Sequence, residues 1–103
     1  MKKNYFNEFS SFLYRIRKNR GYTMMDVSKE TGLSTGYISD LENKLEERIG
    51  IPRKNNLIKL ASFYNFSEEE ENEYIRILIN LLFDNFFTEE QIKFIREQYK
   101  IFK

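Results

Sequence analysis

The sequence predicts an all-α protein. Apolar residues recur at three- and four-residue spacing along most of the chain, which is the period of an amphipathic helix. Helix breakers are few, with four Gly and one Pro in 103 residues, and no segment shows the two-residue alternation typical of a strand. Hydrophobic residues make up 41% of the chain, enough for one buried core. We therefore expect one helical domain followed by a C-terminal extension.

The first two helices are defined by their end signals. An apolar face repeats over about residues 5–19, and this helix should stop near Gly21. Thr23 is an N-cap residue, and Asp26 provides an acidic group at the third helical position. The second helix should then end at Gly32, after barely two turns.

The third and fourth helices are predicted in the same way. Ser34 caps a third short helix over about residues 34–43. Pro52 suits the first turn of a fourth helix, which Asn65 should end in a left-handed conformation. The apolar positions on the second, third and fourth helices are assigned only to the core, namely Val27, Ile38, Leu41, Leu57 and Leu60.

Two further helices form the C-terminal part. Ser67 and Glu70 make a capping box for a fifth helix, whose apolar surface over 74–87 is wider than one neighbouring helix can cover. Thr88 and Gln91 repeat the device for a final helix. We expect a dimerisation seam along that helix at Ile92, Ile95, Tyr99 and Phe102. The alternative is that the final helix folds back and completes a monomeric core.

Charge is distributed unevenly along the chain. The net charge is only +1, but residues 1–66 hold twelve Lys and Arg against seven Asp and Glu. Residues 67–103 hold five against nine. A basic front and an acidic back are typical of a protein whose first part meets phosphate.

Several function classes are excluded by composition. The chain has no Cys and no His, so thiolate sites, disulfides and histidine chemistry are absent. No glycine-rich phosphate loop or clustered acidic pair suggests a reactive pocket, so we expect no enzyme, cofactor or metal. No apolar run reaches signal-peptide length or the roughly 18 residues of a membrane span, and we expect a cytoplasmic protein without a membrane partner.

The functional element is the pair of short helices joined through Gly-Leu-Ser at 32–34. This is the layout of a helix-turn-helix, in which the glycine makes the turn and the second helix projects from the domain. A projected helix fits the major groove of B-DNA, with its N-terminal residues nearest the base edges.

Two segments of the chain resemble the Cro/CI-type repressors of the XRE family. The stronger is TMMDVSKETGLSTGYISDLEN at 23–43, and the second is PRKNNLIKLASFYNF at 52–66. The resemblance implies a five-helix phage-repressor-like domain, here with an additional C-terminal helix. The resemblance runs from about Phe12 to Phe66, and we assign the helix-turn-helix DNA-binding core to 1–66. From their apolar surface we expect the helices of 67–103 to complete that core and to dimerise.

The resemblance also implies roles for individual residues. Arg17 and Glu42 occupy positions where such domains often pair the first helix with the third, as a structural lock. The positions that face the groove for base readout are Thr35, Gly36, Ser39 and Asp40. The positions that meet the DNA backbone are Thr23, Tyr37, Asn43, Lys44, Arg53 and Lys54.

The chain departs from the family pattern between Glu42 and Pro52, where it is about three residues longer than usual. The third helix is therefore expected to continue through Leu45 to Arg48 and end at Gly50. Met24 replaces the Gln that commonly anchors the backbone, and the recognition helix lacks the Arg or Gln that gives strong bidentate readout. Thr methyl contacts, Lys44 or DNA shape are then expected to supply specificity.

The sequence thus predicts a sequence-specific, double-stranded-DNA-binding transcriptional regulator, a repressor that reads a pseudo-palindromic operator as a homodimer. Asp40 is ambiguous in this reading, because a carboxylate accepts from cytosine but otherwise repels phosphate. The alternative function is a protein-interaction module with the same fold, either antitoxin-like or phage- or plasmid-encoded. The apolar surface over 74–87 supports that alternative.

Overall fold

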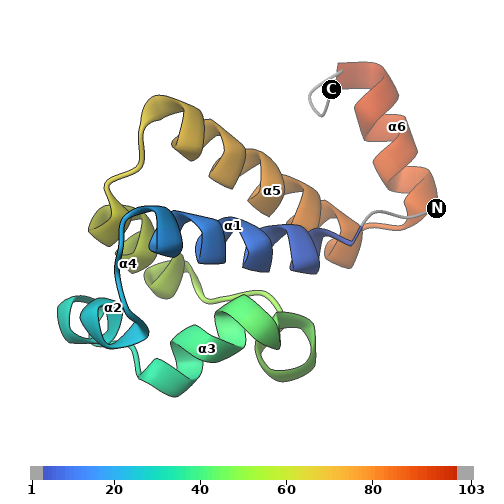
Figure 1. Cartoon of the computed structure of the whole chain (residues 1–103). Helices are drawn as coiled ribbons and strands as arrows, with labels where there is room; N and C mark the ends of the chain where they lie inside the picture. Colours follow the sequence, from blue (N-terminus) through green and yellow to red (C-terminus); the bar gives the residue numbers. More distant parts are fainter. Residues whose placement is uncertain (1–3, 100–103) are drawn as a thin grey trace.

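The chain folds into α-helices joined by short connections, which confirms the predicted all-α class (Figure 1). The computed structural model describes residues 4–99, apart from the side chains of Ile92, Ile95, Arg96, Gln98 and Tyr99. Within this range there is no strand, and no helix is long and apolar enough to cross a bilayer. The helices are α1 (Tyr5–Asn19), α2 (Met24–Thr31), α3 (Thr35–Asn43), α4 (Lys54–Tyr64), α5 (Glu68–Phe86) and α6 (Glu89–Tyr99), and a π-helical turn, η1 (Leu45–Ile49), follows α3.

Local capping fixes most helix ends where the sequence predicted them. The side chains of Thr23 and Ser67 each accept a hydrogen bond from the third helical N–H, and the acidic residue there accepts from the cap N–H in return. Gly32 ends α2 with φ 77°, and Asn65 ends α4 with φ 49°. Both residues are types that tolerate the left-handed region.

Helix α1 lies at the centre of the fold, with α5 packed along one side and α3 along the other (Figure 1). Helix α2 packs against α3 and α4. Helix α6 turns away from the bundle beyond the end of α5 (Figure 1). The predicted dimerisation residues Ile92, Ile95 and Tyr99 have side chains outside the described residues, and Phe102 lies outside them entirely.

An aromatic cluster joins α1 to α5 and to the end of α4. The Tyr74 ring lies 5.8 Å from the Phe9 ring and 5.7 Å from the Phe12 ring, and Phe66 lies 4.9 Å from Tyr74. The Tyr74 hydroxyl donates to the carbonyl of Leu57 on α4, and burial raises the pKa of Tyr74 above its ordinary value. Most of the predicted core is confirmed as buried, namely Val27, Ile38, Leu41 and Leu60, while Leu57 is half-buried.

Two predictions about the segment between α3 and α4 are wrong. Helix α3 does not continue to Arg48, because Lys44 leaves the helical region with φ −133° and ψ 33°. That break turns the chain so that Leu45 is only 2% exposed and joins the core. Pro52 is not in the first turn of α4, since that helix begins two residues later and Pro52 is buried in the connection.

Ion pairs fasten α5 to α1. Arg20 donates two hydrogen bonds to Glu70, with Nη2 to Oε1 at 2.7 Å, and Arg15 and Arg76 make further pairs across the same contact. The Arg20 guanidinium, together with the N–H of Ser67, lowers the pKa of Glu70 to about 2. Because the folded pKa is depressed, this contribution to stability is present above the unfolded pKa and is lost as pH falls.

We therefore expect the melting temperature to fall as pH decreases from 5 toward 2, partly through Glu70. In Glu70→Gln, which keeps an acceptor for the cap but removes the charge, the melting temperature should be lower at pH 6 and fall less on acidification. Thermal melts by circular dichroism test this, with Glu47→Gln at an exposed position as the control. Parallel pH profiles for Glu70→Gln and the unmodified protein would contradict the assignment.

Candidate nucleic-acid interface

The turn between α2 and α3 is built by side chains as well as by Gly32. The Thr31 hydroxyl donates to the carbonyl of Val27 at 2.7 Å and accepts from the N–H of Leu33 at 3.2 Å. Leu33 is buried and pins the turn to the core, and Ser34 then caps α3 by accepting from the N–H of Tyr37. These contacts fix the direction in which α3 leaves the turn.

One face of α3 is polar and accessible. Thr35 and Gly36 are exposed at its start, and the side chains one turn on, Ser39 and Asp40, are partly exposed. Asn43 lies a further turn along, where its amide donates to the carbonyl of Ser39 at 2.9 Å. The predicted readout residues therefore share one exposed side of a single helix.

The opposite side of α3 is locked to α1 by a buried ion pair. Arg17 Nε donates to Glu42 Oε2 at 2.8 Å, and Nη2 donates to Oε1 at 2.9 Å. The side chains are only 9% and 2% exposed, and the hydrogen bonds to Glu42 raise the pKa of Arg17. Arg17 Nη1 also donates to the carbonyl of Tyr22, so the same guanidinium holds the connection into α2. A bidentate pair of this kind fixes both distance and orientation.

Two further contacts position α3, and no sequence pattern marks either of them. The Ser10 hydroxyl of α1 donates to the carbonyl of Leu41 at 2.7 Å. The Asn56 amide of α4 donates to the Tyr37 hydroxyl at 3.1 Å, which ties the start of α4 to α3. Because both pairs join distant segments, they are visible only in the folded chain.

The predicted backbone-contacting residues lie around α3. Lys44 is exposed immediately after its last residue, and Arg53 and Lys54 are exposed where α4 begins. Arg53 is the N-cap of α4 and makes no side-chain cap hydrogen bond there. Thr23 is exposed at the start of α2, where its oxygen accepts from the N–H of Asp26. Cationic side chains, hydroxyl groups and helix N-termini are the groups that bind phosphates in protein–DNA complexes.

A short helix pair with a fixed turn, an accessible polar second helix and flanking cations defines a helix-turn-helix unit. The family model described as a helix-turn-helix domain matches residues 11–76, nearly two thirds of the chain. The chain therefore belongs to this helix-turn-helix family, which confirms the predicted resemblance and implies DNA binding. No curated protein and no solved structure matches the chain.

The buried lock generates a stability prediction. Arg17→Ala leaves Glu42 charged and buried without its partner, so the free energy of unfolding should fall by about 3–5 kcal/mol. Arg15→Ala on the same helix is the matched control, because the Arg15 pair with Glu73 is half-exposed and should cost about 1 kcal/mol or less. Urea unfolding measures both, and equal losses would contradict a special role for the Arg17 pair.

Proposed function

We propose that this protein is a sequence-specific transcriptional repressor that inserts α3 into the major groove of double-stranded DNA as a homodimer. The observation that carries the proposal is the accessible polar face of α3, mounted rigidly by Arg17 and Glu42 and flanked by exposed cations. Rigid mounting favours specific readout, because side chains held in place reach base edges without an ordering cost.

The base-reading side chains are short. Thr35 offers a hydroxyl and a methyl group, and Ser39 offers a hydroxyl, so each can contact a base edge only if α3 lies deep in the groove. Gly36 supports such an approach, because it has no side chain to hold the DNA away from the helix backbone. The space that a Cβ would occupy there is open, with no atom closer than 4.0 Å. Asp40 completes this face, where a carboxylate accepts from the amino group of cytosine but is repelled by phosphate unless a cation lies beside it.

The backbone contacts surround this face. Lys44 supplies positive charge at the end of α3, and Arg53 and Lys54 supply it at the start of α4, where a helix N-terminus adds to the attraction for phosphate. Thr23, Tyr37 and Asn43 supply polar groups at the ends of α2 and α3. These contacts set the register of the domain on DNA and are independent of sequence.

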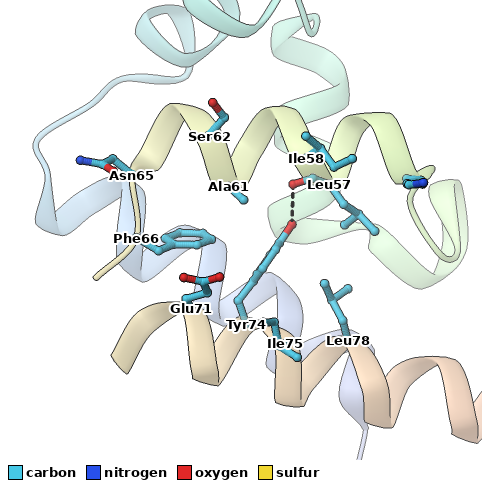
Figure 2. Close-up of a pocket in the computed structure, with 11 residues that line it drawn as sticks. Leu57, Ile58, Ala61, Ser62, Asn65, Phe66, Glu71, Tyr74, Ile75 and Leu78 are labelled. Atoms are coloured by element: carbon cyan, nitrogen blue, oxygen red, sulfur yellow. Dashed lines mark hydrogen bonds between the residues drawn. The ribbon is translucent and has the colours of Figure 1, made fainter. Parts of the chain in front are cut away.

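Dimerisation is supported by an apolar stripe on α5. Ile75, Leu82 and Phe86 are 44%, 38% and 70% exposed, and together with the half-buried Ile79 they repeat at four-three-four spacing. This is the spacing of a helix seam that packs against another helix. The stripe continues into a groove of about 590 Å³ between α4 and α5, where Ile58 lies opposite Ile75 (Figure 2). We propose that α5 and the seam of α6 pair with a second copy.

The same apolar groove supports the alternative, a module that binds another protein. In Figure 2 the groove is lined by Leu57 and Ala61 from α4 and by Leu78 from α5, an apolar surface suited to a partner helix. The two functions differ in which residues matter. Substitutions on α3 impair DNA binding by the repressor but leave a protein-binding module intact, whereas substitutions in the groove impair the module.

The first prediction of the proposal concerns DNA. The protein should select a preferred duplex from random DNA and bind it with an affinity that falls steeply with salt. Thr35→Ala or Ser39→Ala should change the preferred base at one position at a cost of about 1–3 kcal/mol, while Arg53→Ala should weaken all sequences alike. Electrophoretic mobility shifts with competitor DNA measure both effects. Equal binding to every sequence at moderate salt would rule out specific regulation.

The second prediction concerns assembly. Light scattering at tens of micromolar should give a dimer for the intact chain and a monomer for Leu82→Lys/Phe86→Lys, because two charges on the stripe oppose burial. A chain ending at Asn85 should also be monomeric. Met25→Lys is the control, since Met25 is 65% exposed on α2, away from the stripe. A monomeric intact chain that protects only one half-site would overturn the dimer.

A further inference from the structure

The turn η1, which extends the connection after α3, is a firmly held part of the molecule. Leu45 is buried at its start, and the half-buried Ile49 packs against the core at its end. Its backbone is closed by hydrogen bonds from Arg48 N–H to Lys44 carbonyl at 2.9 Å and from Gly50 N–H to Leu45 carbonyl at 2.6 Å. Anchored at both ends, this turn presents Arg48 at a fixed place beside α3.

The Arg48 side chain extends toward the recognition face. It is 65% exposed, and its Nη1 lies 3.9 Å from Oδ1 of Asp40, whose side chain is 27% exposed. This distance gives attraction without a hydrogen bond, so the donors of the guanidinium stay available for another acceptor. The pair therefore joins a residue of η1 to one that lies on the polar side of α3.

Asp40 needs such a partner if α3 enters DNA. An isolated carboxylate in the major groove is repelled by the phosphates on both sides. None of the predicted readout residues on α3 carries a positive charge that would offset this repulsion. Arg48 removes that repulsion, because its charge lies next to the carboxylate.

Resting on the proposed DNA-binding function, we propose that Arg48 is a specificity-determining residue that reads a guanine in the major groove, with Asp40 as its positioning residue. The guanidinium fork matches the O6 and N7 acceptors of guanine in a bidentate contact. Arg48 thereby supplies the long donor side chain that α3 itself lacks. The insert after α3 extends the recognition surface beyond the helix.

The experiment starts from the duplex that the unmodified protein selects and measures binding to every single-base-pair variant of it. Arg48→Ala should lower affinity for the best site by about 10-fold to 100-fold and abolish the preference for guanine at one base pair. Preferences at the other positions should stay unchanged. Arg48→Lys should restore only part of the discrimination, because an ammonium group cannot form the bidentate contact.

The Asp40→Asn variant separates the role of Asp40 in positioning Arg48 from the repulsion between its carboxylate and the DNA phosphates. Removing the carboxylate should raise binding to nonspecific DNA, since one repulsion is lost, while discrimination at the guanine contacted by Arg48 should fall several-fold. A purely structural role would not produce these opposite changes. Arg15→Ala on α1 is the control, because its side chain pairs with α5 and should leave all preferences intact.

Three outcomes would overturn the proposal. Uniform weakening across sequences in Arg48→Ala, with the salt slope reduced by about one, would make Arg48 a phosphate contact instead. Unchanged binding would make it a solvated side chain. If the unmodified protein itself selects no duplex, the proposed regulator function fails first and this inference falls with it. The unmodified protein therefore distinguishes failure of the function from failure of the Arg48 assignment.

Discussion

The buried pair between Arg17 and Glu42 is the contact on which the arrangement of the recognition unit depends. Removing two charges from water is costly, and the bidentate geometry with a third hydrogen bond to the Tyr22 carbonyl offsets that cost. An apolar contact in the same place would tolerate sliding of α3 along α1. The ion pair does not, because both hydrogen bonds would be lost together. The fold thus exchanges some stability for a fixed orientation.

Helix α1 makes ion pairs with both α3 and α5, but these pairs differ in burial and therefore in their contribution to stability. Toward α3 it makes the buried pair, whereas toward α5 it uses Arg15, Arg20 and Glu8 in more exposed pairs. Exposed pairs contribute little each, so the side chains that α5 buries, chiefly Tyr74, Ile77 and Leu81, supply most of the stability of this helix contact. The charged groups at that contact chiefly set its register.

Short-range chemistry explains what could be predicted from the sequence. The caps at Thr23 and Ser67 and the left-handed ends at Gly32 and Asn65 depend on residues within one turn, so their patterns are readable in order along the chain. The family resemblance was carried by the residues of 23–43 and 52–66, both of which lie within the segment that the family model matches.

Long-range packing explains what could not be predicted. The break at Lys44 arises because burying Leu45 outweighs another helical turn, and nothing in the local sequence favours one over the other. Ser10 and Asn56 act on carbonyl and hydroxyl groups 31 and 19 residues away. The contact between Arg48 and Asp40 could not be predicted either, because it depends on the path of the chain through η1. On a continuous helix, residues eight positions apart would lie more than two turns from each other.

The central place of α1 has a geometric consequence for the proposed dimer. Helices α5 and α3 pack on opposite sides of α1 (Figure 1), so in the proposed dimer α1 would separate the helix that pairs with the second copy from the helix that enters DNA. The separation of the two recognition helices is then a property of the monomer's interior. Core substitutions that shift α1, even by the width of a methyl group, would retune which half-site spacing the dimer accepts without altering a single DNA-contacting residue.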